Sequence, residues 1–145
     1  MLVHQIMKSK ATDRVVTIRP EERVSAAVDV LARERIGTVV VTPDDATVQG
    51  ILSERDIVRE LGRRGTSCME DLVTSVMTGK VVFCTRSETS VDVMRKMTDG
   101  RFRHMPVVED GVLVGLISLG DVIKSRLIEL SMEKESLEEM IKGGY

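Results

Sequence analysis

An internal repeat constrains this chain more than any other feature. Residues 50–58 read Gly-Ile-Leu-Ser-Glu-Arg-Asp-Ile-Val, and residues 115–123 read Gly-Leu-Ile-Ser-Leu-Gly-Asp-Val-Ile. Two further pairs of segments align in the same order, residues 35–41 with 101–107 and residues 3–7 with 73–77. A repeat of this kind builds one structural unit more than once, so the two halves are expected to fold alike.

Hydrophobic periodicity predicts the same order of elements in each half. Short runs rich in β-branched residues predict strands at residues 15–18, 38–42 and 48–52 in the first half, and at 81–84, 105–108 and 112–117 in the second. Apolar residues at helical spacing predict helices from Val24 to Ala32 and from Val93 to Met97, and a last helix starts at Ser53 or Ser118. Each half is therefore predicted as strand, helix, strand, strand, helix, an α+β arrangement.

The length of 145 residues accommodates one globular unit built from both halves. A half of about 60 residues is marginal alone, so the halves are expected to share one core as a pseudo-twofold pair. The predicted repeats are residues 1–65 and 66–126, with an extension at 127–145. Gly62 is the predicted end of the first half's last helix, and residues 62–67 are the predicted connector.

Composition excludes several classes of partner. Aromatic residues make up 2% of the chain and the formal net charge is −2, so base stacking and phosphate-backbone binding are not expected, and nucleic acid is not a predicted partner. No apolar run is long enough for a secretion signal or a membrane span. Cys68 and Cys84 form no disulfide framework, so we expect a cytoplasmic protein with free thiols.

Catalytic and metal-binding patterns are missing from the sequence. The two histidines, His4 and His104, have no cysteine or carboxylate at metal-ligand spacing. No serine or cysteine is paired with a credible base, and no phosphate-loop or dinucleotide glycine pattern occurs. We therefore predict a binding protein and not an enzyme, with no metal and no catalytic cofactor.

Each final helix begins with a serine that is followed three residues later by an aspartate. Ser53 and Asp56 form this block in the first half, and Ser118 and Asp121 form it in the second. One interpretation is half of a nucleotide site, in which the serine and the helix amides bind phosphate and the carboxylate binds ribose. The alternative is a capping box that serves only the helix end.

These patterns resemble the cystathionine-β-synthase-type (CBS) domain pair, also called a Bateman module. The resemblance rests on the two Gly-h-h-Ser-x-x-Asp blocks, where h is apolar, and on Arg-His-Met-Pro-Val-Val at residues 103–108. It implies tandem CBS repeats and a regulatory module that binds AMP, ADP, ATP, NAD or S-adenosylmethionine in clefts between the repeats and dimerises. No effector domain is expected in this length, so the regulated protein is expected on another chain. The alternative is a constitutive interaction module whose clefts stay empty.

The resemblance also implies which residues contact the ligand. Main-chain groups of each first strand would read the adenine base, and apolar side chains would cover its faces. The candidate nucleotide-binding residues are Thr17, Ile18, Ser53, Arg55, Asp56, Phe83, Cys84, Arg103, His104, Met105, Pro106, Ser118 and Asp121. For Ile18 and Met105 the alternative is a place in the core.

The densest basic cluster of the chain is residues 101–104. Arg103 and His104 are predicted to neutralise a phosphate, whereas the matching residues 35–38 carry a single charge. We therefore expect the site built around the second repeat to be the stronger, with Asp121 contributing more than Asp56. The alternative for the basic cluster is a solvated corner.

The last helix continues beyond the repeat. Its apolar positions follow spacings of four and three residues and include one lysine: Ile123, Leu127, Leu130, Lys134, Leu137 and Ile141. This heptad pattern, which ends at Gly143-Gly144, predicts a helix that pairs with a second copy or docks a target. The alternative is a helix that lies on its own domain.

Overall fold

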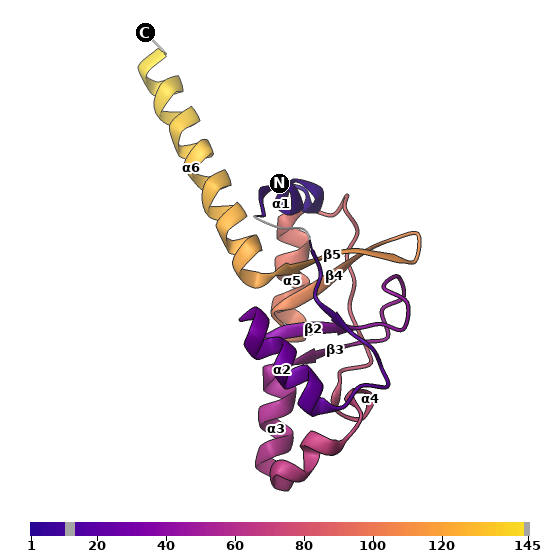
Figure 1. Cartoon of the computed structure of the whole chain (residues 1–145). Coiled ribbons are helices and arrows are strands. Elements are labelled where there is room, and N and C mark those ends of the chain that lie inside the picture. Colours follow the sequence, from indigo (N-terminus) through magenta and orange to yellow (C-terminus); the bar gives the residue numbers. More distant parts are fainter. Residues whose placement is uncertain (11–13, 144–145) are drawn as a thin grey trace.

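The computed structural model describes residues 1–10 and 14–143, and it shows the repeat as two similar halves (Figure 1). The first half consists of β1 (Thr17–Ile18), α2 (Val24–Glu34), β2 (Thr38–Val41), β3 (Gly50–Ser53) and α3 (Glu54–Arg64). The second consists of α5 (Ser90–Gly100), β4 (His104–Glu109), β5 (Val112–Ser118) and α6 (Leu119–Gly143). Two short helices, α1 (Val3–Ser9) and α4 (Val73–Val76), precede the halves. The α+β fold of two tandem repeats is confirmed.

One predicted strand, at residues 81–84, is wrong. In the first half β1 pairs in parallel with β2, which pairs antiparallel with β3. In the second half β4 and β5 pair antiparallel, and Cys84 makes only an isolated bridge to β4. Val40 in β2 donates its N–H to the carbonyl of Val16 at 3.2 Å. Its counterpart in β4 is Pro106, which has no N–H to donate, so the strand is reduced to a bridge.

Each half has its own hydrophobic core, which corrects the expectation of one shared core. The first core contains side chains of α2, β2 and β3 together with Val73 and Val76 of α4. The second contains side chains of α5, β4 and β5 together with Val3 and Ile6 of α1. The short helices are thus exchanged, because each one packs in the half that it does not precede. The repeat boundaries after residues 65 and 126 stay a prediction.

The exchanged helices explain the glycine that opens each repeated block. A Cβ on Gly50 would lie 2.4 Å from Sδ of Met77, and a Cβ on Gly115 would lie 2.4 Å from Cε of Met7. Met7 lies in α1, and Met77 directly follows α4. A residue without a side chain is therefore needed in both strands for the exchanged helix to approach the sheet.

Helix α3 ends later than the sequence predicts. It continues past Gly62 to Arg64 and is followed by a 3-10 helix over Gly65–Glu70, so the predicted connector is helical and the predicted end at Gly62 is wrong. Arg63 and Arg64 pair with Glu60 at 2.9 and 3.0 Å, and cations in the last turn suit the helix dipole. Gly65, with a φ of 69°, then ends the helix.

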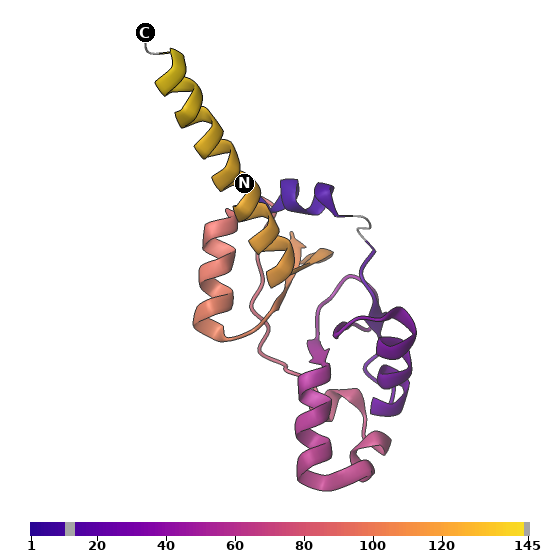
Figure 2. The same ribbon diagram turned by 90° about the vertical axis from the view of Figure 1, so that its left-hand side faces the viewer.

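Helix α6 is one continuous helix of 25 residues, and its C-terminal part projects away from both halves (Figure 1 and Figure 2). Its first turns pack on the second half through the buried residues Val122 and Ser125. The predicted continuation of the helix is confirmed as far as Gly143, and Gly144 lies outside the described residues. In the described ranges, no helix combines the length and apolar character needed to cross a membrane.

Candidate functional site

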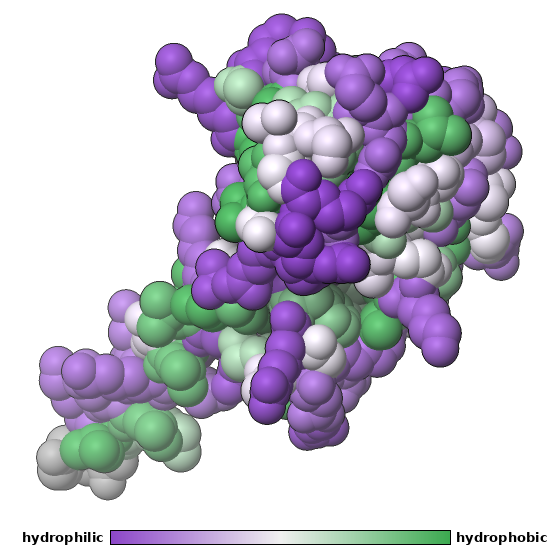
Figure 3. All heavy atoms as spheres, turned by 90° about the horizontal axis from the view of Figure 1, so that it is seen from below, coloured by the Kyte–Doolittle hydropathy of each residue, from purple (hydrophilic) through white to green (hydrophobic). Residues whose placement is uncertain are grey.

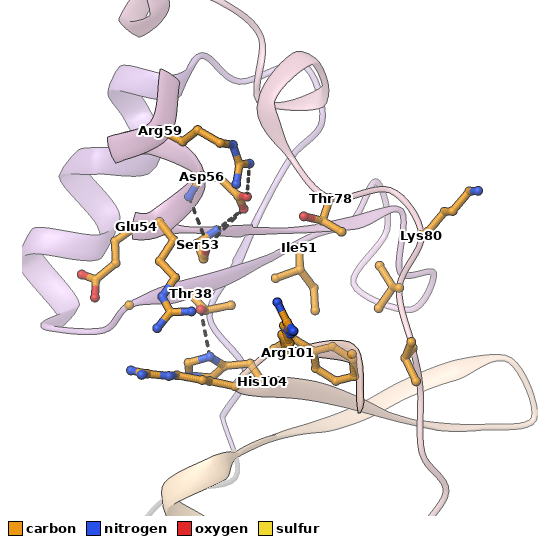
Figure 4. A pocket seen from close by; sticks show the side chains of 17 residues that line it. Thr38, Ile51, Ser53, Glu54, Asp56, Arg59, Thr78, Lys80, Arg101 and His104 are labelled. Carbon is orange, nitrogen blue, oxygen red and sulfur yellow. Dashed lines mark hydrogen bonds and ion pairs between the residues drawn. The ribbon is translucent and has the colours of Figure 1, made fainter. Parts of the chain in front are cut away.

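Two clefts lie at the junction of the halves. The larger, with a volume of about 520 Å³, lies between the β3–α3 junction of the first half and residues 78–82 and 100–104 of the second (Figure 4). The smaller, of about 310 Å³, lies between residues 14–16 and 34–38 of the first half and the end of β5. Small-molecule sites span roughly 300–1,000 Å³, so the larger cleft is well within this range and the smaller is at its lower limit.

Thr38 and His104, the first residues of β2 and β4, line both clefts. Thr38 Oγ1 and His104 Nδ1 are hydrogen-bonded at 3.1 Å (Figure 4). Burial and the charge of Lys10 lower the pKa of His104 below its ordinary value of 6.5, although Asp121 acts in the opposite direction. The imidazole is therefore neutral at pH 7 and offers the clefts a hydrogen-bonding group instead of a positive charge.

The Ser53–Asp56 block forms a complete capping box at the start of α3. The Asp56 carboxylate accepts the Ser53 N–H at 2.9 Å, and Ser53 Oγ accepts the Asp56 N–H at 3.3 Å. Arg59 donates to the other carboxylate oxygen at 2.7 Å, and Asp56 is only 5% exposed. Ser53, Asp56 and Arg59 also line the larger cleft, so the block caps the helix and borders the cleft at the same time.

The Ser118–Asp121 block has the same cap but a different ion-pair partner. The Ser118 N–H donates to Asp121 at 2.8 Å, and the Asp121 N–H donates to Ser118 Oγ at 3.1 Å. The Lys10 ammonium lies 3.0 Å from the Asp121 carboxylate and 2.8 Å from the carbonyl oxygen of Leu116. Burial alone would raise the pKa of Asp121, but the Ser118 N–H and Lys10 bring it below its ordinary value. Lys10 therefore engages the carboxylate that the sequence assigned to ribose.

The amides at the start of the final helices are largely used inside the protein. The Glu54 N–H donates to the carbonyl of Gly37 at 2.9 Å, and the Leu119 N–H donates to the carbonyl of Arg103 at 2.7 Å. The third amide of each helix is taken by the capping serine. The helix ends thus offer an anion fewer amides than the sequence indicated, and most of the positive charge must come from side chains.

Arginine side chains supply that charge in the larger cleft. Arg55, Arg101 and Arg103 line it, and none of the three forms an ion pair or a side-chain hydrogen bond within residues 1–10 and 14–143. Arg101 points into the cleft toward Ile51, whereas Glu54 and Lys80 point away (Figure 4). Guanidinium groups are well suited to bidentate binding of phosphate. Arg103 borders the cleft of Ser53 and Asp56, whereas the sequence grouped it with Asp121.

The residues predicted to hold the base lie outside both clefts. Ile18, Cys84 and Met105 are buried in the cores, in keeping with the core alternative for Ile18 and Met105, and Pro106 is buried as well. Thr17 and Phe83 do not line either cleft. The preceding residues line them instead: Val81 and Val82 in the larger cleft, Val15 and Val16 in the smaller. The β-branched runs at residues 15–18 and 81–84 therefore do contribute to the clefts, but the lining comes from the first two residues of each run.

Sequence reasoning missed two further apolar residues of the larger cleft. Ile51 of β3 and Phe102, which follows α5, complete its apolar lining. Ile51 lies two residues before Ser53 on the same strand, so the alternation of side chains along the strand could have identified it. No local signal marked Phe102, because it reaches the cleft only through the docking of the two halves.

The cysteines give no sign of chemical activity at the clefts. Cys84 is 2% exposed, and burial raises the pKa of its thiol to about 12, which keeps it protonated. Cys68 is also buried. Among the residues that the structure describes, no three His, Cys, Asp or Glu side chains are grouped so that they could hold a metal ion.

Comparisons with known proteins match this architecture. The family model described as CBS domain matches residues 3–63 and 73–128. CBS domain-containing protein CBSX3, mitochondrial, from Arabidopsis thaliana is 31% identical over 99% of this chain and 73% of its own length. The crystal structure of the CBS-domain containing protein ATU1752 from Agrobacterium tumefaciens is 40% identical, has a TM-score of 0.82, and covers 87% of this chain and 99% of that one.

A more distant structure was solved with ligands. The CBS domain pair of protein MJ0100, in complex with 5′-methylthioadenosine and S-adenosyl-L-methionine, is 22% identical, with a TM-score of 0.75 over 90% of this chain and 98% of that one. At this identity the likeness concerns the fold. The chain spans only 24% of a longer Arabidopsis relative. Because the family matches cover both structural halves, the chain belongs to the CBS-domain family.

Proposed function

We propose that this chain is a regulatory module that binds an adenine nucleotide in the larger cleft and thereby modulates a separate protein. The observation that carries the proposal is the group of arginines without ion-pair partners in the described part of the chain, Arg55, Arg101 and Arg103, beside Ser53 and Asp56. Further support comes from MJ0100, whose CBS pair was solved with two adenosine-containing ligands.

Each part of a nucleotide has a matching surface in this cleft. Ile51, Val81, Val82 and Phe102 are apolar and would cover the faces of adenine. The Asp56 carboxylate would accept ribose hydroxyls in place of Arg59, whose side chain is 59% exposed and has room to turn away. The arginines would bind the phosphates through charge-assisted hydrogen bonds.

The charge of the cleft favours ligands with phosphate. The lining contains more cationic than anionic side chains, and Glu54, one of its two carboxylates, points away from the cleft. A positive surface attracts AMP, ADP, ATP or NAD and repels the sulfonium of S-adenosylmethionine. We therefore propose a phosphate-bearing adenine nucleotide as the ligand.

The smaller cleft is proposed as the weaker site, which reverses the ranking made from the sequence. Lys10 pairs with Asp121 at 3.0 Å, and a ribose would have to displace a charged group that belongs to the protein. Asp56 pairs only with Arg59 of its own helix, which is the more exposed partner. Asp56→Ala is therefore expected to weaken nucleotide binding more than Asp121→Ala.

Calorimetric titration of the full chain with AMP, ADP, ATP, NAD and S-adenosylmethionine tests the proposal. Loss of one charge-assisted contact corresponds to roughly a tenfold or larger rise in the dissociation constant, so we expect this for Arg101→Gln and Arg103→Gln. Arg95→Gln, an exposed arginine outside the cleft, is the matched control. Equal affinity of the wild type, the cleft variants and the control would contradict the proposal.

A second candidate is a constitutive interaction module that binds no nucleotide. The complete capping boxes favour it, because both aspartates already have protein partners. A thermal-shift experiment separates the two candidates, since saturation at 100 times the dissociation constant stabilises the folded state by about 2.7 kcal/mol. An unchanged melting temperature with all five ligands would favour the constitutive module.

We also propose that the chain acts without catalysis, as a homodimer in the cytoplasm. The relatives named above are described by their CBS domains and not by an enzymatic activity. The name of CBSX3 places that relative in mitochondria, so the compartment of this chain stays a prediction. Fluorescence microscopy of the tagged chain in its own cells tests it.

A further inference from the structure

Helix α6 carries a stripe of large apolar side chains that remain in contact with water in this structure. Ile123, Leu127, Leu130, Leu137 and Ile141 are 43, 61, 49, 60 and 69% exposed. Apolar side chains gather on the projecting part of the helix, at the lower left of Figure 3. A continuous exposed apolar surface of this kind marks an interaction site.

The stripe faces away from the surface by which α6 packs on its own half. Val122 and Ser125 are the buried residues of the helix. At 3.6 residues per turn, the heptad positions point on average roughly 130° away from these two residues. The described 25 residues correspond to a length of about 37 Å. A second helix can therefore lie along the stripe without displacing the body of the protein.

Charge disfavours a parallel pair of these helices. In a parallel coiled coil, identical core positions face each other, so Lys134 would face Lys134 of the second copy. The flanking residue Glu133 would face Glu138 of the second copy on both sides. All of these contacts join like charges.

In an antiparallel pair, the same heptad positions avoid the contact between two lysines. When Leu130 faces Lys134 of the second copy, Leu127 faces Leu137 and Ile123 faces Ile141 along the whole stripe. Each of the six heptad positions then has a partner, and the single lysine meets a leucine instead of another lysine.

The flanking charges near the two ends of the antiparallel pair are complementary. Lys124 lies beside Glu138 of the second copy, and the twofold symmetry makes this contact twice. At the centre, Glu133 faces Glu133 of the second copy, and the two neighbouring copies of Lys134 offset this one like-charge contact. Opposite charges at flanking positions set the orientation of coiled coils.

We propose that α6 pairs with α6 of a second copy as an antiparallel two-helix coiled coil. This inference rests on the proposed homodimer and gives it an interface and an orientation. The family match ends at residue 128, so most of this interface lies in the part of α6 beyond the matched repeats. The dimer thereby holds the two nucleotide modules at opposite ends of the helix pair.

Cysteine cross-linking of the full chain tests the orientation. Leu127→Cys and Leu137→Cys are purified separately and then oxidised alone or as a mixture; the native cysteines are both buried. An antiparallel pair cross-links strongly in the mixture and weakly in either variant alone. A parallel pair cross-links Leu127→Cys to itself, and the absence of any cross-link shows that the helices do not pair there. Either result would overturn the inference.

Sedimentation equilibrium tests the interface independently of orientation. Leu127→Glu is expected to raise the dimer dissociation constant by roughly a hundredfold, because it puts a charge opposite Leu137 of the second copy in the apolar seam. Met132→Glu is the matched control, since Met132 is 61% exposed but lies on the opposite side of the helix from the seam, and it should leave the constant unchanged. An unchanged dimer in Leu127→Glu refutes the α6 interface but leaves the homodimer standing, whereas a monomeric wild type refutes both.

Exchanging the charges of Lys124 and Glu138 tests the register of the helix pair. Lys124→Glu and Glu138→Lys are each expected to weaken the dimer, and the double variant is expected to restore it, as in an antiparallel pair. Failure of the double variant to recover would contradict the proposed register. Titration of Leu127→Glu with the best nucleotide shows separately whether the cleft still functions.

Discussion

Thr38 and His104 occupy equivalent positions in the two repeats, and they hydrogen-bond to each other at 3.1 Å across the junction. Residues 35–41 align with residues 101–107, so the bond joins two equivalent residues of the two halves. It therefore lies at the pseudo-twofold axis. Both residues line both clefts. A ligand in either cleft would therefore contact residues that also line the other cleft.

Thr38→Val is expected to destabilise the folded protein by about 1–3 kcal/mol, because the half-buried His104 Nδ1 loses its partner while the shape of the side chain is kept. Urea denaturation measures the free energy of unfolding. Thr17→Val is the matched control, since it removes a hydrogen bond to Asp45 at an exposed site and should cost less. A Thr38→Val protein as stable as the wild type would show that the bond is unimportant.

Stability is expected to depend on pH through His104. Its pKa is lowered in the folded state, so the unfolded chain binds a proton first as the pH falls below the ordinary value of 6.5. This contribution is complete above that value and is lost as the pH falls toward the folded pKa. Between about pH 7 and pH 5 the free energy of unfolding should fall more steeply in the wild type than in His104→Gln. Identical slopes would contradict the assignment.

Lys10→Gln is expected to raise the pKa of Asp121, because the ammonium that lowers it is removed. A carboxylate with a lowered folded pKa adds stability above its ordinary value of 3.8 and loses it as the pH falls below that value. The variant should therefore have less of this acid-sensitive stability. Carbon-13 NMR titration of the Asp121 carboxyl measures the shift, with Lys8→Gln as control. An unshifted Asp121 in Lys10→Gln would rule out the ion pair in solution.

Gly50→Ala is expected to destabilise the protein more than Gly115→Ala. A Cβ at Gly50 would lie 2.9 Å from the backbone carbonyl oxygen of Thr78, which cannot turn aside. A Cβ at Gly115 meets chiefly the Cε end of Met7, a flexible side chain. Overpacking costs about 1–3 kcal/mol, and Gly50→Ala should lie toward the upper part of this range.

Thermal denaturation compares these variants. Gly79→Ala is the control, because a Cβ there has no neighbour within 4 Å. A larger loss of stability in Gly115→Ala than in Gly50→Ala would show that Met7, and not the backbone beside Gly50, is the rigid neighbour.

The parts of the fold with local causes could be predicted from the sequence. Ser53 and Ser118 predict the starts of α3 and α6 because a capping serine acts on amides within its own turn. Apolar residues at helical spacing predict α2 and α5 for a similar reason. Pro106 is the local exception, since its missing N–H removes a strand that the β-branched run at residues 81–84 predicts.

The parts that depend on how the halves meet could not be predicted. Lys10 and Asp121 are far apart in the sequence, and only the packing of α1 on the second half brings them to 3.0 Å. Arg103 joins the cleft of Asp56 through the docking of the two halves. Side-chain types indicated a phosphate site, but the assignment of each residue to a cleft needed the three-dimensional structure.

The exchange of α1 and α4 has a consequence for the autonomy of each repeat. Residues 1–65 taken alone would lack Val73 and Val76, which complete the core of the first half. Residues 66–126 would likewise lack Val3 and Ile6. Neither repeat can be transplanted into another protein with its core intact, so the interlocked pair is the smallest portable unit of this chain.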